Sequence, residues 1–325
     1  MKSLNKNRSI VAVVDRINSR DNVDIYTDTL EFTSNIYFDA FENALKHTNR
    51  KYYIYNSPKE FIDNIAKHKN DIVFSAIWSG TLSRNRKSLV PGICESYNID
   101  YIGADVYVQT ICQDKYLSKI FCQNYGIEIP RGYTFDDSSN LEVIKNLSFP
   151  LIIKPNCEGS SIGISDRNIV DNYNDAHKLA KKLLKKFKPI IIEEYVDGDE
   201  VSICLVGRAS VDVCEAIALT INGNTYFSHQ IWGFESKKCG QYEVGRKCVT
   251  SKIPEQIISA CKKIFLDLKK VDYMRIDGRI KDNKFYLIEL TPDCSLHPEC
   301  FMANTFYANN MTYDDMIEKF ISLYD

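Results

Sequence analysis

The stretch FPLIIKPNCEGSSIGIS, residues 149–165, decides the fold of this chain. Its first half is an apolar strand that carries one cation, Lys154. Its second half, residues 158–163, is a turn of small residues whose backbone N–H groups and hydroxyls can surround phosphate oxygens. A fixed positive charge beside a flexible Gly/Ser turn is what triphosphate binding requires. The stretch therefore predicts an enzyme that uses a nucleotide.

The composition is that of an ordinary soluble globular protein. The 325 residues are 44% hydrophobic and 26% charged, and the formal net charge is -2. This charge gives no reason to expect nucleic acid or an anionic membrane as a partner. No apolar run reaches the ~20 residues that span a bilayer, and residues 10–14 are too short for an export signal. The 11 cysteines are scattered, without a Cys-x-x-Cys pair, so we expect reduced thiols in a cytoplasmic protein.

One group of soft ligands needs its own interpretation. Cys294, His297 and Cys300 have a spacing that allows a three-ligand metal site with one open position. The alternative is a plain loop after a strand. We favour the loop, because a second cluster with ligand spacing is missing from the rest of the sequence.

The chain divides into three predicted parts. In residues 1–107 strands alternate with helices, which indicates a parallel, Rossmann-like α/β layer. The turn after its first strand lacks Gly-x-Gly-x-x-Gly, which argues against dinucleotide binding. Residues 108–189 and 190–325 mix helices and strands as α+β units. The expected strands are 9–15, 51–55, 71–77, 100–102, 189–195, 200–206, 211–221, 273–280 and 284–290, and the expected helices are 35–47, 58–67, 88–97, 108–126, 172–187, 254–268 and 312–324.

Two further groups of residues have the chemistry of a nucleotide site. Arg275 and Asp277 share a face of one strand, and Glu289 can lie beside Asp277 if the neighbouring strand pairs with it. Paired carboxylates suit Mg²⁺, although a surface hairpin with ordinary charge pairs would look the same. The second group, residues 193–200, is an acidic strand end and a glycine turn that can present backbone groups to an adenine edge. Glu200 could then accept hydrogen bonds from ribose hydroxyls.

Together these motifs resemble the ATP-grasp ligases, and among them the D-alanine–D-alanine ligase group. The resemblance covers about residues 101–303, and it extends more loosely through the N-terminal layer. It depends on the order and spacing of short motifs: Tyr101-Ile-Gly103, Asp114-Lys115, Phe149-Pro150, Lys154-Pro155, Glu158-Gly-Ser-Ser161, Glu193-Glu-Tyr-Val196, Glu200, Arg275-Ile-Asp277 and Glu289. It implies an ATP-grasp fold with ATP and Mg²⁺ (or Mn²⁺) as cofactors.

The resemblance also implies a role for each matching residue. Lys115 and Lys154 would bind phosphates, and the turn would close over them. Arg275 would face the developing oxyanion and act in catalysis with Lys154 and Ser160. The nucleotide-binding residues would be Lys115, Lys154, Glu158, Ser160, Ser161, Glu193, Tyr195, Val196 and Glu200, and the metal ligands would be Asp277, Glu289 and Thr291.

The implied reaction is ADP-forming ligation of a small-molecule carboxylate to an amine through an acyl phosphate. A homodimer is compatible with the sequence. Three departures from the family pattern limit how far the resemblance extends. Thr291 stands where Glu-x-Asn usually supplies an amide ligand, so that Asp293 is a second candidate. Residues 226–243, in the place of the lid, contain Gln230-Ile-Trp232, with Lys237 and Lys238 a turn later, instead of a Lys-Tyr pair. The loop 78–87 is basic where relatives carry an acidic anchor.

A basic loop that faces the substrate favours a second anionic group on it, and the alternative is that Arg84, Arg86 and Lys87 form a solvated turn. We therefore expect an amino-acid-like substrate other than D-alanine. The alternatives are a D-alanine–D-alanine ligase of cell-wall synthesis, and an ATP-binding protein of the same fold that has lost catalysis. The sequence leaves open the identity and chirality of both substrates.

Overall fold

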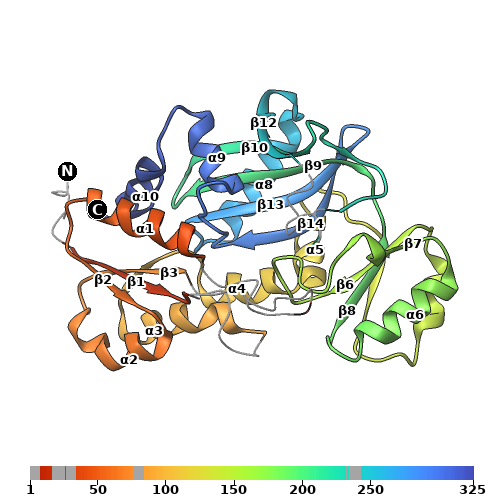
Figure 1. The fold of residues 1–325 in the computed structure, drawn as a ribbon, viewed down its shortest axis with the longest axis horizontal. Helices are drawn as coiled ribbons and strands as arrows, with labels where there is room; N and C mark the ends of the chain where they lie inside the picture. Colours follow the sequence, from red (N-terminus) through yellow and green to blue (C-terminus); the bar gives the residue numbers. More distant parts are fainter. Residues whose placement is uncertain (1–7, 17–25, 27–33, 77–83, 232, 234–242) are drawn as a thin grey trace.

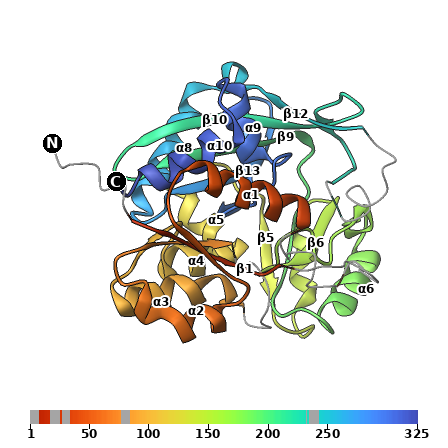
Figure 2. The ribbon, with the colours of Figure 1, turned by 60° about the vertical axis from the view of Figure 1, so that its left-hand side comes forward.

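The computed structural model describes residues 8–16, 26, 34–76, 84–231, 233 and 243–325. Three sheets organise these residues, with strand orders β2-β1-β3-β4, β5-β8-β6-β7 and β12-β10-β9-β13-β14, and β11 pairs with β9. In Figures 1 and 2 the green β6–β8 and α6 region lies at one end of the molecule, away from the orange N-terminal sheet. The predicted class, a parallel α/β layer joined to α+β units, is confirmed.

The N-terminal sheet is parallel and buried on both faces. β1 (Ile10–Val14) is fully buried and pairs with β2 (Tyr52–Tyr55) and β3 (Ile72–Ala76), which pairs with β4 (Asp100–Ile102). Covering both faces explains why these strands are apolar runs rather than alternating patterns. Helices α2 (Pro58–Asn64) and α3 (Leu89–Tyr97) cover one face, and α1 (Asn35–His47) and α10 (Tyr313–Ser322) cover the other.

The contact with α10 shows that the chain returns to its first layer. Phe74 of β3 lies edge-to-face with Phe41 of α1 at 5.1 Å and with Phe320 of α10 at 6.1 Å. Such pairs add to the stability gained from burying the rings. The C-terminal helix is therefore part of the N-terminal core.

The helix expected over residues 108–126 is two helices. α4 (Val106–Gln113) ends where α5 (Lys115–Gln123) begins, because Asp114 has the extended backbone of an N-cap (φ -92°, ψ 106°). Its carboxylate accepts hydrogen bonds from the backbone N–H groups of Tyr116 and Leu117, both at 3.0 Å. The break places Lys115 in the first turn of a new helix.

The second sheet is antiparallel and contains β5 (Gly132–Phe135), β6 (Leu151–Pro155), β7 (Ile169–Val170) and β8 (Ile190–Glu194). Helix α6 (Tyr173–Leu183) packs on one face. Alternation directs Ile190 and Ile192 of β8 toward that core and Glu193 to the opposite face. Since β8 pairs with β5 and β6, we propose that the boundary expected at 189/190 lies after β8 instead.

The third sheet provides the polar surface of the candidate site. Helix α8 (Glu255–Asp267) covers one face of this sheet. Helix α9 (Phe301–Ala308) lies on the other face, in the same hydrophobic core as α10. Helix α9 was not predicted from the sequence. β13 and β14 form the predicted hairpin. The strands are β9 (Gly198–Gly207), β10 (Val211–Ile221), β11 (Tyr226–Phe227), β12 (Val244–Cys248), β13 (Tyr273–Lys281) and β14 (Lys284–Pro292).

Candidate active site

A stripe of polar residues crosses three neighbouring strands of the third sheet. The strand register places Asp277 opposite Ser202 on one side and opposite Glu289 on the other. Residues two apart on a strand share a face, so the stripe continues along each strand. It contains Glu200 and Ser202 on β9, Arg275, Asp277 and Arg279 on β13, and Glu289 and Thr291 on β14.

Asp277 is the centre of a hydrogen-bond cluster in this stripe. Arg275 donates Nε to Oδ1 at 3.0 Å and Nη2 to Oδ2 at 2.8 Å, which is a bidentate pair. Ser202 donates to Oδ1 at 2.6 Å, and Thr291 donates to Oδ2 at 3.1 Å. Burial disfavours the charge on Arg275, but Asp277 beside it raises its pKa. The predicted catalytic arginine and two predicted metal ligands therefore lie together.

Glu289 meets the first lysine of α5. Its Oε2 lies 3.0 Å from Nζ of Lys115, which also donates to the backbone carbonyl of Glu158. Burial favours the neutral carboxyl of Glu289, but the charges of Lys115, Lys154 and Arg275 lower its pKa to about 2. A carboxylate with this pKa remains charged at neutral pH.

The donor set of the stripe fits a hard divalent cation. Asp277 and Glu289 are opposite neighbours, and the Thr291 hydroxyl bonds to Asp277. Arg275 and Lys115 now neutralise these two carboxylates, as a cation between them would. Asp293, the second candidate ligand, does not join this group. Its oxygens accept from the backbone N–H of Ala104 at 2.9 Å and from Gln109 at 2.6 Å.

Lys154 shares one carboxylate with a second buried lysine. Its Nζ lies 2.6 Å from Oε1 of Glu193, and Lys119 of α5 bonds to Oε2 of the same residue. Burial favours a neutral Glu193, but the two lysines outweigh burial and lower its pKa. Sequence reasoning missed Lys119, whose one signal was its position one helical turn after Lys115.

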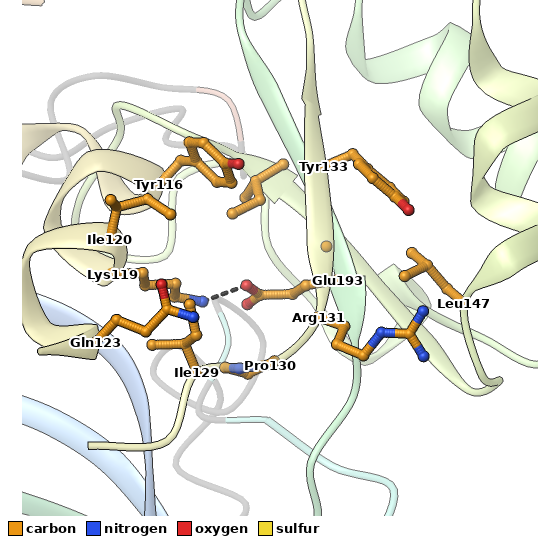
Figure 3. A pocket seen from close by; sticks show the side chains of 12 residues that line it. Tyr116, Lys119, Ile120, Gln123, Ile129, Pro130, Arg131, Tyr133, Leu147 and Glu193 are labelled. Carbon is orange, nitrogen blue, oxygen red and sulfur yellow. Dashed lines mark hydrogen bonds and ion pairs between the residues drawn. The ribbon is translucent and has the colours of Figure 1, made fainter. Parts of the chain in front are cut away.

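A pocket of about 290 Å³ lies on the α5 side of this cluster (Figure 3). Tyr116 and Gln123 of α5 line it together with Tyr133 of β5, and the Lys119–Glu193 pair forms part of its wall. Glu193 is the one predicted nucleotide residue among those that line the pocket. The pocket therefore borders the predicted phosphate residues without containing them.

The turn after β6 has an unusual backbone. Ser160 and Ser161 have φ values of 50° and 63°, in the left-handed region that non-glycine residues rarely adopt. Such conformations cost about 1–3 kcal/mol each and concentrate at ligand-binding sites. Glu158 at the start of the turn pairs with the buried Arg86, with 3.0 Å between Nη2 and Oε2. The basic loop 78–87 was expected to face the substrate, but the charge of its Arg86 neutralises Glu158 instead.

Asn156 fixes the turn to α5. Its backbone carbonyl accepts from the N–H of Lys115 at 3.2 Å, and its side-chain oxygen accepts from the N–H of Tyr116 at 3.1 Å. This buried amide therefore satisfies donors at the start of α5 and sets the position of Lys115 relative to β6. Asn156 was not predicted as a site residue, and Arg86 was expected to face the substrate as part of the basic loop, not to bind Glu158.

The predicted adenine and ribose residues form a second group around Arg279. This arginine donates to Glu200, to the Val196 carbonyl and to the Tyr195 hydroxyl. The structure thus places the predicted residues in two groups, one at the phosphate end and one at the ribose end. Residues 232 and 234–242 of the predicted lid and residues 78–83 of the basic loop lie outside the described residues.

The cysteine group behaves as a loop. Cys294 is buried, His297 Nδ1 lies 3.2 Å from the backbone N of Glu299, and Cys300 Sγ lies 3.6 Å from the Ser295 hydroxyl. Within the part of the chain that the structure describes, no three His, Cys, Asp or Glu side chains form a metal-binding group. In the same ranges no helix is long and apolar enough to cross a bilayer.

These features define an ATP-grasp protein with an N-terminal α/β layer. A solved D-alanine–D-alanine ligase from Bacillus anthracis, complexed with ATP, matches the fold with a TM-score of 0.74 and 18% identity over 97% of both chains. The VanG D-Ala:D-Ser ligase from Enterococcus faecalis matches with a TM-score of 0.72 and 18% identity, over 98% of this chain and 100% of that one.

Sequence comparisons give the family. The family model for the D-ala D-ala ligase C-terminus matches residues 126–322. The D-alanine–D-alanine ligase of Aquifex aeolicus is 27% identical over 255 residues, which cover 77% of this chain and 81% of that protein. Ligase A of Bacillus cereus is 24% identical over 234 residues, covering 71% and 74%. The chain belongs to the D-alanine–D-alanine ligase family, and it is therefore an ATP-grasp ligase that forms amide bonds.

Proposed function

We propose that the protein uses ATP to join the carboxylate of D-alanine to the amine of a second D-amino acid, with release of ADP and phosphate. The observation that carries the proposal is the ion pair between Lys115 and Glu289. It brings a predicted phosphate-binding lysine to a predicted metal-binding carboxylate, as a site for a metal–nucleotide complex needs. Lys154 contributes to the low pKa of the same carboxylate, so it belongs to the same electrostatic group.

The first step is phosphoryl transfer. One carboxylate oxygen of D-alanine attacks the γ-phosphorus of ATP, the bond from that phosphorus to the β–γ bridging oxygen breaks, and ADP leaves. Lys115 and Lys154 neutralise charge on the transferring group, and the turn with Ser160 and Ser161 donates to its oxygens. A Mg²⁺ or Mn²⁺ ion held by Asp277, Glu289 and Thr291 would neutralise further phosphate charge.

The second step forms the amide. The neutral amine of the second amino acid attacks the carbonyl carbon of the acyl phosphate, and a tetrahedral intermediate with a negative oxygen results. Arg275 stabilises this oxyanion, a contribution of about 3–4 kcal/mol for one such donor. The carbon–oxygen bond to phosphate then breaks, and the nitrogen loses its extra proton to solvent.

Two observations support D-alanine as the carboxylate substrate, in place of the other amino-acid-like substrates that the sequence favoured. The relatives in the family are D-alanine–D-alanine ligases. In addition, Arg86 of the basic loop pairs with Glu158, and so its charge gives no argument for an anionic substrate.

Arg246 on β12 and Arg275 both lie over the Phe301 ring, at 5.3 and 5.2 Å from its centroid. Their charges suit substrates that bear carboxylates.

The experiment is incubation with ATP, Mg²⁺ and D-alanine, alone and with D-serine, followed by mass spectrometry and an ADP assay. We expect ADP release that matches dipeptide formation and includes D-alanyl-D-alanine. ATP binding without ADP release for any pair in a broad panel would favour the alternative that catalysis has been lost. ADP release with other substrate pairs, but not with D-alanine, would instead support the expectation from the sequence, an amino-acid-like substrate other than D-alanine.

A further inference from the structure

Arg279 is a buried arginine at the ribose end of the proposed nucleotide site, and it is 3% exposed. Its Nη2 donates to Oε2 of Glu200 at 3.0 Å and to the backbone carbonyl of Gln230 at 2.8 Å. Its Nη1 donates to the Val196 carbonyl at 2.9 Å and to the hydroxyl of Tyr195. One guanidinium therefore binds acceptors from the end of β8, from β9 and from the segment after β11.

The strand register fixes the contact between Arg279 and Glu200. The two residues are directly opposite on β13 and β9, so a short reach joins them. Arg279 bonds to Oε2, and Oε1 makes no hydrogen bond to the described residues. Glu200 thus has one oxygen held by the protein and one available for a ribose hydroxyl.

Two aromatic rings lie near the guanidinium of Arg279. Its guanidinium carbon lies 4.9 Å from the centroid of the Tyr195 ring and 5.7 Å from that of Phe227 on β11. The Tyr195 hydroxyl also donates to the Gln230 carbonyl at 2.7 Å and accepts from its N–H at 3.2 Å. Tyr195, at the predicted adenine edge, is therefore connected to Gln230 both directly and through Arg279.

We propose that Arg279 is a positioning residue of the nucleotide site, an inference that rests on the proposed function. It orients Glu200 for the ribose and keeps the Val196 carbonyl and Tyr195 in place at the adenine edge. Without the guanidinium, Glu200 loses its charge partner and rotates toward solvent, and the Val196 carbonyl loses a donor. Arg279 therefore sets the preference for ribose over deoxyribose without touching the reacting phosphate.

Calorimetric titration with Mg·ATP and Mg·2′-deoxy-ATP, in the absence of amino acids, tests this role. We expect Arg279→Met to weaken ATP binding by about tenfold or more, and 2′-deoxy-ATP binding by less, so that the preference between them shrinks. Arg279→Lys keeps the charge but not the planar fork, so it should show an intermediate preference for ATP over 2′-deoxy-ATP. This variant serves as the test if Arg279→Met does not fold. Lys281→Met, on the same strand as Arg279, is the matched control, since it removes an ion pair with Asp197 and should bind like the wild type.

Two results would overturn the inference. One is a wild-type protein that binds both nucleotides equally. The other is an Arg279→Met or Arg279→Lys variant with wild-type ATP affinity and preference. A wild-type protein that does not bind ATP at all would instead overturn the proposed function, and the inference with it.

Discussion

Lys115 and Glu289 form an ion pair of 3.0 Å between the first turn of α5 and strand β14. Glu289 lies opposite Asp277 in the hairpin, and Asp277 is bound by Arg275. The two predicted metal carboxylates are thus each matched with a different cation. An ATP–metal complex would enter a site whose positive and negative groups are already arranged for phosphate and cation.

Lys154→Met should reduce kcat/KM for ATP by at least about 100-fold, because it removes a fixed charge from the transferring phosphoryl group. The variant also leaves Glu193 with Lys119 as its one cationic partner among the described residues. The measurement is steady-state ADP release, with unfolding by urea as a check of the fold. Lys145→Met is the matched control, since Lys145 is an exposed lysine that pairs with Glu142. Equal activity of wild type and Lys154→Met would exclude the phosphate role.

Glu193→Gln should lower the free energy of unfolding at pH 7 by about 3–5 kcal/mol, because two buried lysines lose their shared carboxylate. The folded pKa of Glu193 is below its ordinary value of 4.5, so its stabilisation is complete above that pH and is lost as the pH falls below it. Urea unfolding between pH 3 and pH 7 should therefore show a flatter acid limb in the variant. Glu194→Gln, beside it but paired with the exposed Arg131, is the control. Unchanged stability at pH 7 would contradict the buried cluster.

Thr291→Asn should lower the Mg²⁺ concentration for half-maximal activity, and Thr291→Val should raise it by about tenfold, because the amide oxygen ligates a hard cation and the methyl group does not. Thr291 now donates to Asp277 at 3.1 Å. A Mg²⁺ titration of ADP release gives both values, at saturating ATP. If all three proteins need the same Mg²⁺ concentration, Thr291 is not a ligand.

Arg86→Met should raise the KM for ATP by about tenfold and leave the KM for D-alanine unchanged, since Arg86 orders Glu158 in the phosphate turn. Arg84→Met, at an exposed position of the same loop, is the control. The opposite pattern, with a large change for the amino acid and none for ATP, would restore the interpretation that this loop binds the substrate.

Local patterns predicted much of the fold. Buried apolar runs in residues 9–15 and 71–77 predicted the parallel strands, and the pattern around Asp277 and Glu289 predicted the hairpin that places these two carboxylates opposite each other. The split of residues 108–126 depended on the Asp114 cap. Asp is favoured at helix starts over helix interiors, so Asp114 was a signal for this break, which the continuous apolar periodicity hid.

The missed site residues are those whose partners are distant in sequence. Lys119 finds Glu193 and Arg279 finds Val196 only after separate sheets and helices have packed. Asp293 fits the metal pattern by spacing, yet the fold directs it to Ala104 and Gln109. Spacing along one strand predicts which side chains share a face, but not which element arrives on that face.

The central claim is an acyl phosphate formed in the Lys115, Lys154 and Arg275 site, and isotope transfer tests it most directly. D-alanine labelled with ¹⁸O in its carboxylate is incubated with ATP, Mg²⁺ and the enzyme, and the released phosphate is analysed by mass spectrometry. We predict one ¹⁸O atom per phosphate, because the attacking carboxylate oxygen leaves with phosphorus. Dipeptide formation with unlabelled phosphate would contradict the account.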